Sequence, residues 1–381
     1  MTDDTSTPTG KPGTFRSVDK LVQLTRKRAE AHDLAKERHT YGRWEEDAND
    51  AALVAESVYT STGTKLLHHP ERLAQINAGE YRPIVLQIAP TDKCNLECHF
   101  CSTSHREGDE LKIDRLMRTI DDMMDPAVGP LKSAEVTGGG DPTMYKPLPQ
   151  LLGHLRQHGI DIGMITNGIL LGKLANDHPG MLDQLTWLRI SHSYLDDDNH
   201  YSGQNKISNF VIPKIAGDIS FSYVWHDKST LQRLEQLAAI SEENKGTFLR
   251  IVPDCHDPLA QQKFKEEIAP RIDEMLPGAS FGQKKPYDIH NKCRVGFIKP
   301  FLNPDGFFYH CSAAPLYEGK FNAQGGAWRI GSMDEAKSIW PHGWKERRMD
   351  TSHCHAGMCF YSDQNRMLDS AERVVPHSNF V

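Results

Sequence analysis

Six short apolar runs, separated by amphipathic segments, constrain the fold of this chain most strongly. The runs have the length of strands, and the segments between them show the apolar spacing of helices. The strand-like runs cover residues 84–89, 133–137, 160–166, 187–191, 219–224 and 248–252. The helical segments include 111–124, 148–158 and 230–244. This alternation predicts an α/β fold of βαβ units with a parallel sheet, whose functional loops follow the strands.

Three stretches of different character divide the chain of 381 residues. Residues 1–80 open with a leader rich in Thr, Asp, Pro and Gly over 1–13, which we expect to be disordered, and continue with helical spacing over 17–38, 44–58 and 63–76. Residues 81–285 contain the six predicted strands. Over residues 286–381 the alternation stops and four cysteines accumulate, which predicts a small metal-stapled domain.

Composition excludes several classes of protein. Hydrophobic residues make up 38% and charged residues 25%, as in ordinary globular proteins. No run approaches the roughly 18 apolar residues of a membrane span, and the N-terminus lacks the apolar core of a signal peptide. We therefore expect a cytoplasmic protein without membrane contact. The net charge of -7 argues against a uniformly basic nucleic-acid binder.

Three cysteines, Cys94, Cys98 and Cys101, follow the first predicted strand directly. In a reducing compartment, clustered cysteines serve metal binding or catalysis more often than disulfides. Three thiolates can each bind one iron of a cubane, and because no fourth cysteine lies nearby, one iron would keep an open position. Two alternatives stay open: a zinc site completed by His99, or three unrelated buried cysteines.

The C-x3-C-x2-C pattern, with the aromatic Phe100 before its last cysteine, resembles the signature of the radical S-adenosylmethionine (SAM) superfamily. The resemblance implies that Cys94, Cys98 and Cys101 hold a [4Fe-4S] cluster whose open iron chelates SAM, with Phe100 beside the cofactor. An electron from the cluster then splits SAM to a 5′-deoxyadenosyl radical, which takes a hydrogen atom from the substrate. The family fold is a partial (β/α)6 TIM-like barrel, and its electron donor is a reductant protein such as flavodoxin or ferredoxin.

A glycine run follows the second predicted strand. Gly138, Gly139, Gly140 and Asp141 are by themselves a turn, in which glycine lets the backbone approach a ligand closely. At this place in the chain they resemble the Gly-Gly-Glu-Pro motif of the family, whose backbone binds the SAM ammonium group. Asp141 stands where glutamate is usual.

The third and fourth predicted strands also end in motifs with two interpretations. Thr166 and Asn167 precede Gly168, and Asn-Gly alone is a hairpin-turn signal. In the family, a similar Thr-Asn-Gly closes the third strand near SAM. Ser191 ends the fourth strand, where family analogy places it against the ribose or carboxylate of SAM, and where the plain alternative is a surface residue.

The remaining cysteines predict a second metal centre. Cys293 and Cys311 flank a turn signal at 303–306, so we expect them near opposite ends of a hairpin, and Cys354 and Cys359 follow as C-x4-C. Four thiols fit either a closed zinc site or a fully ligated iron-sulfur cluster. The region resembles the auxiliary-cluster domains called SPASM or twitch, which implies a second [4Fe-4S] cluster.

Cys255 follows the sixth predicted strand and should therefore lie at the mouth of the barrel. A lone cysteine is commonly a small buried hydrophobic residue. Several radical SAM epimerases, however, return a hydrogen atom to the substrate radical from a thiol in such a region. This resemblance makes Cys255 the candidate catalytic residue.

The substrate and the reaction subclass stay open, because a fold does not choose among chemistries. Family members with auxiliary clusters often modify peptides or small natural products by epimerisation, dehydrogenation or rearrangement, so we expect an isomerase or oxidoreductase of that kind. The rival is a base in DNA, as in phage hypermodification, or in tRNA. Residues 11–43 carry nine Lys or Arg against four acidic residues, although this is equally a solvated helix face. A third class is a non-catalytic iron-sulfur or zinc protein.

Overall fold

The fold is described from a computed structural model of the chain. It describes residues 60–103, 106–193, 215–256, 258–276, 280–282, 293–313, 328–349 and 359–373. The predicted leader at 1–13, the predicted helices at 17–38 and 44–58, and Cys354 lie outside the described residues.

One sheet organises the described chain, with its strands in the order β10-β9-β8-β1-β2-β3-β4-β5-β6-β7. The strands are β1 (Val85–Ile88), β2 (Ser133–Val136), β3 (Asp161–Thr166), β4 (Trp187–Ser191), β5 (Asp218–Trp225), β6 (Leu249–Pro253), β7 (Ser280–Gly282), β8 (Phe301–Leu302), β9 (Phe307–Tyr309) and β10 (Arg329–Ser332). From β1 to β7 each strand is parallel to the next. All six predicted strands are confirmed, each end lying within one residue of its predicted place.

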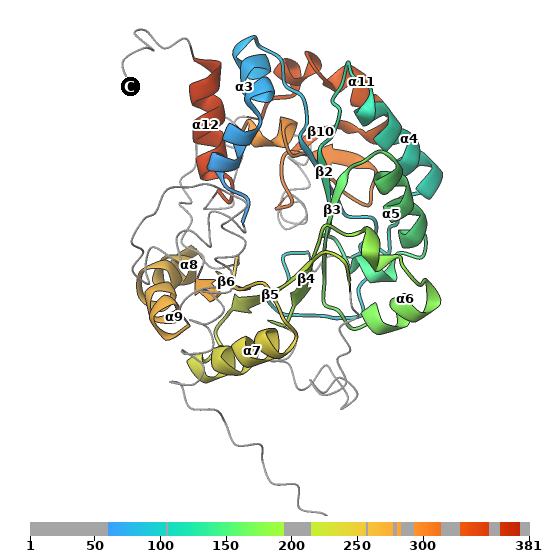
Figure 1. Ribbon diagram of the computed structural model, residues 1–381. Coiled ribbons are helices and arrows are strands. Elements are labelled where there is room, and N and C mark those ends of the chain that lie inside the picture. Colours follow the sequence, from blue (N-terminus) through green and yellow to red (C-terminus); the bar gives the residue numbers. More distant parts are fainter. Residues whose placement is uncertain are drawn as a thin grey trace, which may run out of the picture.

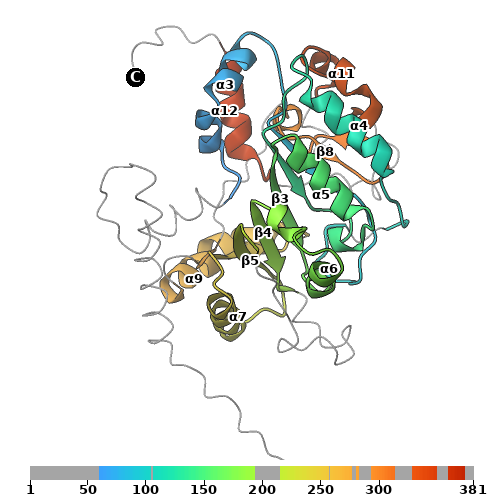
Figure 2. The same cartoon turned by 45° about the vertical axis from the view of Figure 1, so that its right-hand side comes forward.

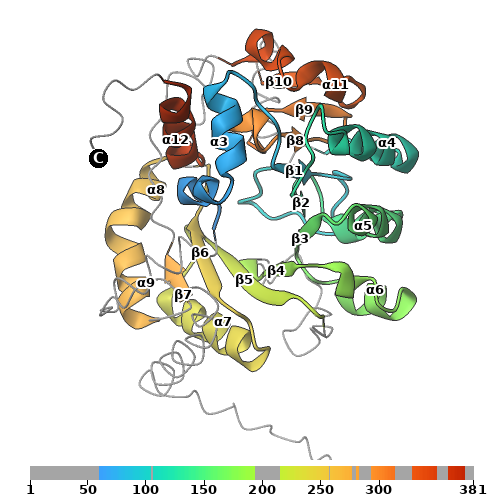
Figure 3. The same ribbon diagram turned by 45° about the horizontal axis from the view of Figure 1, so that its top comes forward.

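Helices connect the parallel strands and lie outside the curved sheet (Figure 3). The α-helices are α3 (Pro70–Asn77), α4 (Ile113–Met124), α5 (Leu148–Gln157), α6 (Leu171–Asp177), α7 (Leu231–Glu243), α8 (Pro258–Lys263), α9 (Ala269–Met275), α11 (Ala336–Ile339) and α12 (Ser362–Glu372). The 3-10 and π segments are η1 (Gly63–His68), η2 (Pro142–Met144), η3 (Leu182–Gln184), η6 (Phe264–Ile268), η7 (Val295–Phe297), η9 (Met333–Glu335) and η10 (Gly343–Arg347). The helices predicted at 111–124, 148–158 and 230–244 are confirmed as α4, α5 and α7.

Parallel pairing and outer helices produce the predicted partial (β/α)6 TIM-like barrel (Figure 1). Leu116, Ile120 and Met123 repeat on one face of α4 and are buried there, as an amphipathic helix packed on a sheet requires. Because the strands β1 to β6 all run in one direction, their carboxyl ends meet at one edge of the barrel. The first three cysteines, the glycine run and Cys255 follow these ends, and Thr166 and Ser191 lie at them.

Segments from the two ends of the described chain pack together on one side of the barrel. The predicted helix at 63–76 forms as η1 and α3, separated at His69 before Pro70. Figure 2 shows α3 beside α12, and the Gly63 amide donates to the Asp363 carboxylate over 2.5 Å. A Cβ at Gly63 would lie 2.9 Å from the Asp363 carbonyl oxygen, so the close approach needs glycine.

The cysteine-rich C-terminal segment continues the barrel sheet. Strand β8 pairs in parallel with β1, and β8, β9 and β10 follow one another antiparallel. The predicted turn at 303–306 closes the β8-β9 hairpin through a hydrogen bond from the Gly306 amide to the Asn303 carbonyl oxygen, 3.0 Å long. Phe301 and Phe308 belong to the same buried cluster as Leu86 of β1. The domain boundaries after residues 80 and 285 stay predictions.

Every helix in the described segments is too short or too polar to span the hydrocarbon core of a bilayer.

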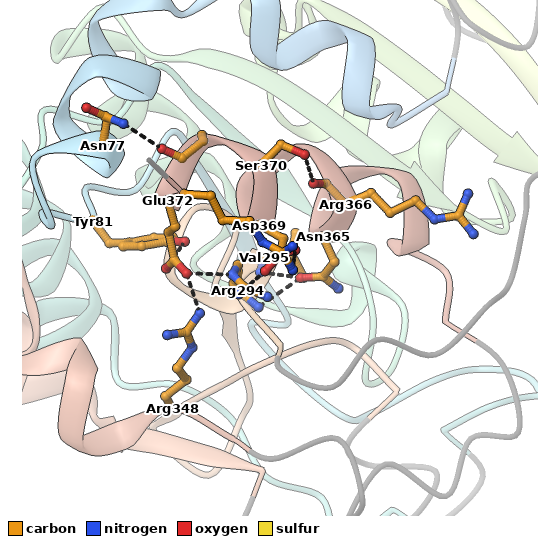
Figure 4. A network of polar contacts seen from close by, with 12 residues as sticks. Asn77, Tyr81, Arg294, Val295, Arg348, Asn365, Arg366, Asp369, Ser370 and Glu372 are labelled. Atoms are coloured by element: carbon orange, nitrogen blue, oxygen red, sulfur yellow. Dashed lines mark hydrogen bonds and ion pairs between the residues drawn. The ribbon is translucent and has the colours of Figure 1, made fainter. Parts of the chain in front are cut away.

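A carboxylate on α12 ties this helix to the start of the C-terminal segment (Figure 4). Glu372 accepts hydrogen bonds from the Tyr81 hydroxyl at 2.7 Å, from Arg294 Nε at 2.8 Å and from Arg348 Nη2 at 2.7 Å. Asp369 forms a second ion pair with Arg294. Burial opposes ionisation of Glu372, but the hydrogen bonds from Tyr81 and the two arginines outweigh it and lower its pKa. The network fixes α12 against the residue that follows Cys293.

Replacement of Glu372 by alanine should lower the free energy of unfolding by about 3 kcal/mol, because the largely buried guanidinium groups of Arg294 and Arg348 lose their common carboxylate. Urea denaturation measures this loss. The matched control is Asp177→Ala, which removes one partner of an exposed pair with Lys173 on α6 and should leave the midpoint in place. Equal midpoints for both variants would show that the α12 network does not stabilise the folded protein.

Candidate functional site

The loop that carries the first three cysteines packs against the glycine run after β2. The Gly140 amide donates to the Thr91 carbonyl oxygen at 2.8 Å, and the Asp141 amide donates to that of Lys93 at 2.9 Å. A Cβ at Gly140 would lie only 1.9 Å from the Lys93 carbonyl oxygen. Gly139 has a φ of +67°, in the left-handed region. The glycines therefore do more than form a turn, since they let two strand-end loops touch through their backbones.

Asp141 joins the ends of β2 and β3. Its carboxylate, 4% exposed, accepts hydrogen bonds from Thr166 Oγ1 at 2.9 Å, from the Asn167 amide at 2.7 Å and from the Thr143 amide at 2.9 Å. Asn167 Nδ2 then donates to Asn95 Oδ1 over 2.8 Å, beside Cys94. The predicted Gly-Gly-Gly-Asp and Thr-Asn-Gly motifs thus meet, and both touch the cysteine loop.

The three cysteines offer three thiol donors from one short loop, a donor set that can bind three irons of a cubane. Among the described residues, the groups whose ligand atoms lie within 4.8 Å of one another do not include Cys94, Cys98 and Cys101 together. A tetrahedral zinc site brings its ligands to one point, whereas the thiolates of a cubane bind different irons. His99, the fourth ligand of the zinc alternative, is instead grouped with His226 and a carboxylate. The donor set therefore fits a [4Fe-4S] cluster.

Arg106 supports the last of these cysteines. Its Nη2 atom donates to Cys101 Sγ at 3.4 Å, and its Nη1 atom donates to the Leu96 carbonyl oxygen at 2.5 Å. Thr103 Oγ1 also lies 3.4 Å from Cys101 Sγ. A cationic donor favours the thiolate form that metal binding requires. Burial first, and then the charge of Asp141, raise the pKa of Cys94.

The loop after β6 approaches the same cysteines. His256 Nε2 lies 3.1 Å from the Cys101 carbonyl oxygen, and Cys255 lines a cavity of about 840 Å³ inside the barrel. Burial first, and then the neighbouring Asp254 charge, raise the pKa of Cys255 to about 11. The structure thus brings the predicted catalytic residue to the barrel mouth, beside the cysteine loop.

Phe100 and Ser191 complete the predicted set at the mouth. The Phe100 ring lines the cavity and stacks on His226, with ring centroids 5.1 Å apart and planes at 11°. Ser191 lies at the carboxyl end of β4, in register with Ser222 of β5. Their contacts with SAM stay predictions.

Asn365 and Tyr361 lie close to three of the other cysteines, which are Cys293, Cys311 and Cys359. Asn365 Oδ1 accepts from the Arg294 amide, next to Cys293, at 2.8 Å, and its Nδ2 donates to Cys359 Sγ at 3.6 Å. Tyr361 is close enough to Cys311 that the thiol contributes to the raised pKa of its phenol, after burial as the main cause. Cys293 lies just before η7, Cys311 follows β9, and Cys359 precedes α12. The hairpin expected between Cys293 and Cys311 forms as β8-β9, with Cys311 directly after it, whereas Cys293 lies farther away than expected, before η7.

Several residues of the site are not found by sequence reasoning. Arg106, Thr103, His226 and His256 are polar loop residues outside the recognised motifs, and Asn95 occupies a position inside the cysteine motif that the motif does not specify. Only the folded chain shows that they contact the cysteine loop or the Phe100 ring. A single sequence gives no signal that separates them from solvated loop residues.

Replacing Asp141 by asparagine should destabilise the protein by about 1 to 3 kcal/mol, because an amide NH2 would then face buried N–H and O–H donors. Thermal unfolding of the cluster-free protein measures this cost without involving cofactors. Asp114→Asn on the exposed face of α4 is the matched control and should unfold as the wild type does. An Asp141→Asn protein as stable as the control would show that the carboxylate does not hold the two loops together.

Comparison with known proteins gives matches over the same region. The sequence model described as the Radical SAM superfamily matches residues 88–200, which include the cysteine loop and the motifs after β2 and β3. A GTP 3′,8-cyclase of Staphylococcus haemolyticus is 40% identical over 291 residues, covering 63% of this chain and 82% of the relative. A probable GTP 3′,8-cyclase of Methanococcus vannielii is 35% identical over 265 residues, covering 63% and 83%.

Among solved structures, SuiB of Streptococcus suis bound to its precursor peptide SuiA matches with a TM-score of 0.49 at 15% identity, covering 86% of this chain and 79% of that chain. The sequence relatives and the family match agree with the cysteine spacing and with the barrel that positions it. The cofactors of the family are a [4Fe-4S] cluster and SAM. The chain belongs to the radical SAM superfamily.

Proposed function

We propose that this chain binds SAM at a [4Fe-4S] cluster held by Cys94, Cys98 and Cys101, cleaves it reductively, and directs the radical to a C–H bond of a substrate inside the barrel. One observation carries the proposal. The cysteine loop is joined by hydrogen bonds to the loops after β2 and β3 at the mouth of a cavity of about 840 Å³. A non-catalytic iron-sulfur protein would not need an internal cavity of this size.

The chain's own residues position the cofactor in this proposal. The superfamily cluster supplies the electron that breaks the sulfonium bond of SAM. The backbone carbonyl oxygens of Gly138, Gly139 and Gly140 would accept from the SAM ammonium group, since the Gly140 amide already donates to Thr91, and Phe100 and Ser191 would lie at the rim. Thr166 and Asn167 are held toward the mouth by Asp141, whose oxygens already accept hydrogen bonds within the protein. Asp141 is therefore a positioning residue for these loops.

A second [4Fe-4S] cluster at the C-terminal cysteines is part of the proposal. Support comes from Asn365 and Tyr361, which bring Cys293, Cys311 and Cys359 toward one another. Cys354 would be the fourth ligand. Electrons would come from a small reductant protein of the flavodoxin or ferredoxin class.

Anaerobic reconstitution tests the cofactor assignment. We expect ~8 Fe per chain, from two four-iron clusters, and release of 5′-deoxyadenosine when the reduced protein meets SAM. Cys98→Ser should halve the iron content and abolish 5′-deoxyadenosine, whereas Cys293→Ser should lose iron and keep the SAM-binding cluster. Zinc at both sites without SAM cleavage would instead identify a non-catalytic metal protein.

The substrate class follows less directly than the cofactor. The relatives' name, GTP 3′,8-cyclase, supports a substrate that contains a nucleoside. Of the substrate classes expected from the sequence, this favours a nucleobase. A peptide or a small natural product stays a prediction, with no feature of the described residues that favours it. Isomerisation and oxidation both begin from the same abstraction of a hydrogen atom.

Cys255 is proposed as the hydrogen-atom donor that completes an isomerisation. The S–H bond would break homolytically and a C–H bond would form on the substrate radical, leaving a thiyl radical that the reductant returns to a thiol with one electron and one proton. The step needs a neutral thiol. Burial raises the pKa of Cys255 to about 11, so the thiol stays protonated throughout the neutral range.

Cys255→Ala should therefore leave 5′-deoxyadenosine release within about twofold of wild type, because Cys255 is no cluster ligand, while removing the product formed by hydrogen return. Mass spectrometry of reactions in D2O, with GTP as the first probe, measures deuterium transferred from solvent-exchanged thiol to carbon. Cys255→Ser is the control of equal size and should behave like alanine, since its O–H bond is too strong to donate. Unchanged product from either variant would exclude the role.

A further inference from the structure

Two helices on the outside of the barrel bring metal-ligating side chains together, away from the cysteine sites. Figures 1 and 3 show α4 beside α5 on the outside of the sheet. Asp121 lies in the last turn of α4, His154 lies in the last turn of α5, and His158 directly follows α5. The chain enters β2 and β3 after these helix ends. The cluster is therefore at the end of the barrel opposite the cysteine loop.

The spacing of the two histidines places them on one face of the helix. The His158 amide donates to the His154 carbonyl oxygen at 3.4 Å, so the helical spacing continues through His158. Side chains four residues apart on a helix lie one above the other, and two histidines with this spacing are a known zinc-binding arrangement. The His154 side chain is 14% exposed and that of His158 is 29% exposed. Partial burial restricts both rings and favours a defined site.

A single carboxylate oxygen of α4 contacts both rings. Asp121 Oδ1 lies 2.9 Å from His154 Nε2 and 2.8 Å from His158 Nε2. The ligand atoms of the three residues all lie within 4.8 Å of one another. In a tetrahedral zinc site with bonds of about 2.0 to 2.1 Å, neighbouring ligand atoms are about 3.3 Å apart. Rotations of the side chains would bring the three atoms to that spacing.

The carboxylate is available to a cation. Within the described residues, the ion pairs of Asp121 are those with the two histidines, whereas its neighbours Asp122 and Asp125 pair with Lys337. An ionised carboxylate only accepts hydrogen bonds, so each Nε2 carries a hydrogen in the metal-free arrangement. Exchange with water can move this proton to Nδ1, and the Nε2 lone pair then faces the carboxylate and can bind a metal.

The donor set selects the class of metal. Two imidazoles and one carboxylate suit zinc and its transition-metal neighbours, whereas magnesium and calcium prefer oxygen ligands alone. The Asp121 side chain is 51% exposed, so water can take the fourth position. The described lining of the 840 Å³ cavity consists of other residues. A metal here would therefore stabilise the helix pair without touching a substrate in the barrel.

We infer that Asp121, His154 and His158 form a binding site for one divalent cation of the zinc class, which links α4 to α5. Helix α4 follows the cysteine loop and α5 follows the glycine run, so the cation would join the two βα units whose loops meet at the barrel mouth. A ligand that binds only the folded state stabilises that state. The inference needs neither SAM nor a cluster and is independent of the proposed function.

Isothermal titration calorimetry of the reconstituted full chain with zinc chloride tests the site, after a chelator wash that removes loosely bound iron. We expect a saturable zinc site and no comparable binding of magnesium chloride. Asp121→Ala, His154→Ala and His158→Ala should each weaken this site by about tenfold or more, because each removes one of three ligands. His178→Ala, exposed at the end of α6, is the matched control and should bind as the wild type does.

Modification of histidines by diethyl pyrocarbonate, followed by mass spectrometry, locates the zinc. Zinc should slow modification of His154 and His158 several-fold and leave His178 unchanged. Zinc bound by the cysteines would not respond to the three alanine variants, so the cluster assignment and this inference can fail separately. Equal zinc affinity in wild type and the three variants would overturn the inference, and so would equal modification rates of His154 and His158 with and without zinc. The three residues would then be a hydrogen-bonded surface cluster.

Discussion

The Asp141 carboxylate is the interaction on which the candidate site depends. Three strand-end loops have to share one small space, and loops alone have little to hold them in register. A buried carboxylate that accepts hydrogen bonds from Thr166 Oγ1 and from the backbone of Asn167 fixes two of them. The neighbouring Gly140 lets the third loop touch the same point, since its amide binds the Thr91 carbonyl oxygen. Charge-assisted hydrogen bonds of this kind are strong when shielded from water.

The C-terminal segment depends on a comparable arrangement. Glu372 and Asn365 lie on one helix, and together they hold Arg294 through its side chain and its backbone amide. The same helix packs on the segment at Gly63. Segments far apart in sequence therefore pack together at the open side of the barrel. The same contacts bring Cys293 near Cys359. The two candidate metal centres are supported by one continuous sheet.

Charged and polar residues line the cavity inside the barrel. The barrel therefore lacks the stabilisation that a packed apolar interior would provide. Apolar contacts between the strands and the outer helices stabilise the barrel, where Leu151 and Leu155 of α5 and Ile162 of β3 are fully buried. Arg189 and Arg250 lie in the same wall as the ion pair of Glu135 and Lys299, and the charges of both arginines act on Glu135. Sites that break the rules of core packing in this way are commonly functional.

The sequence by itself determined the six central strands, their helices and the candidate ligands, because apolar periodicity and cysteine spacing are local properties. It predicted the β8-β9 hairpin from the turn signal at 303–306 but named no strand at β7 or β10, which do not belong to the regular alternation of strands and helices. Only the tertiary structure decided that Asp141 joins two motifs, that Arg106 supports Cys101, and that charged residues line the barrel. These are contacts between distant segments, and their free energy arises from burial that no local pattern records.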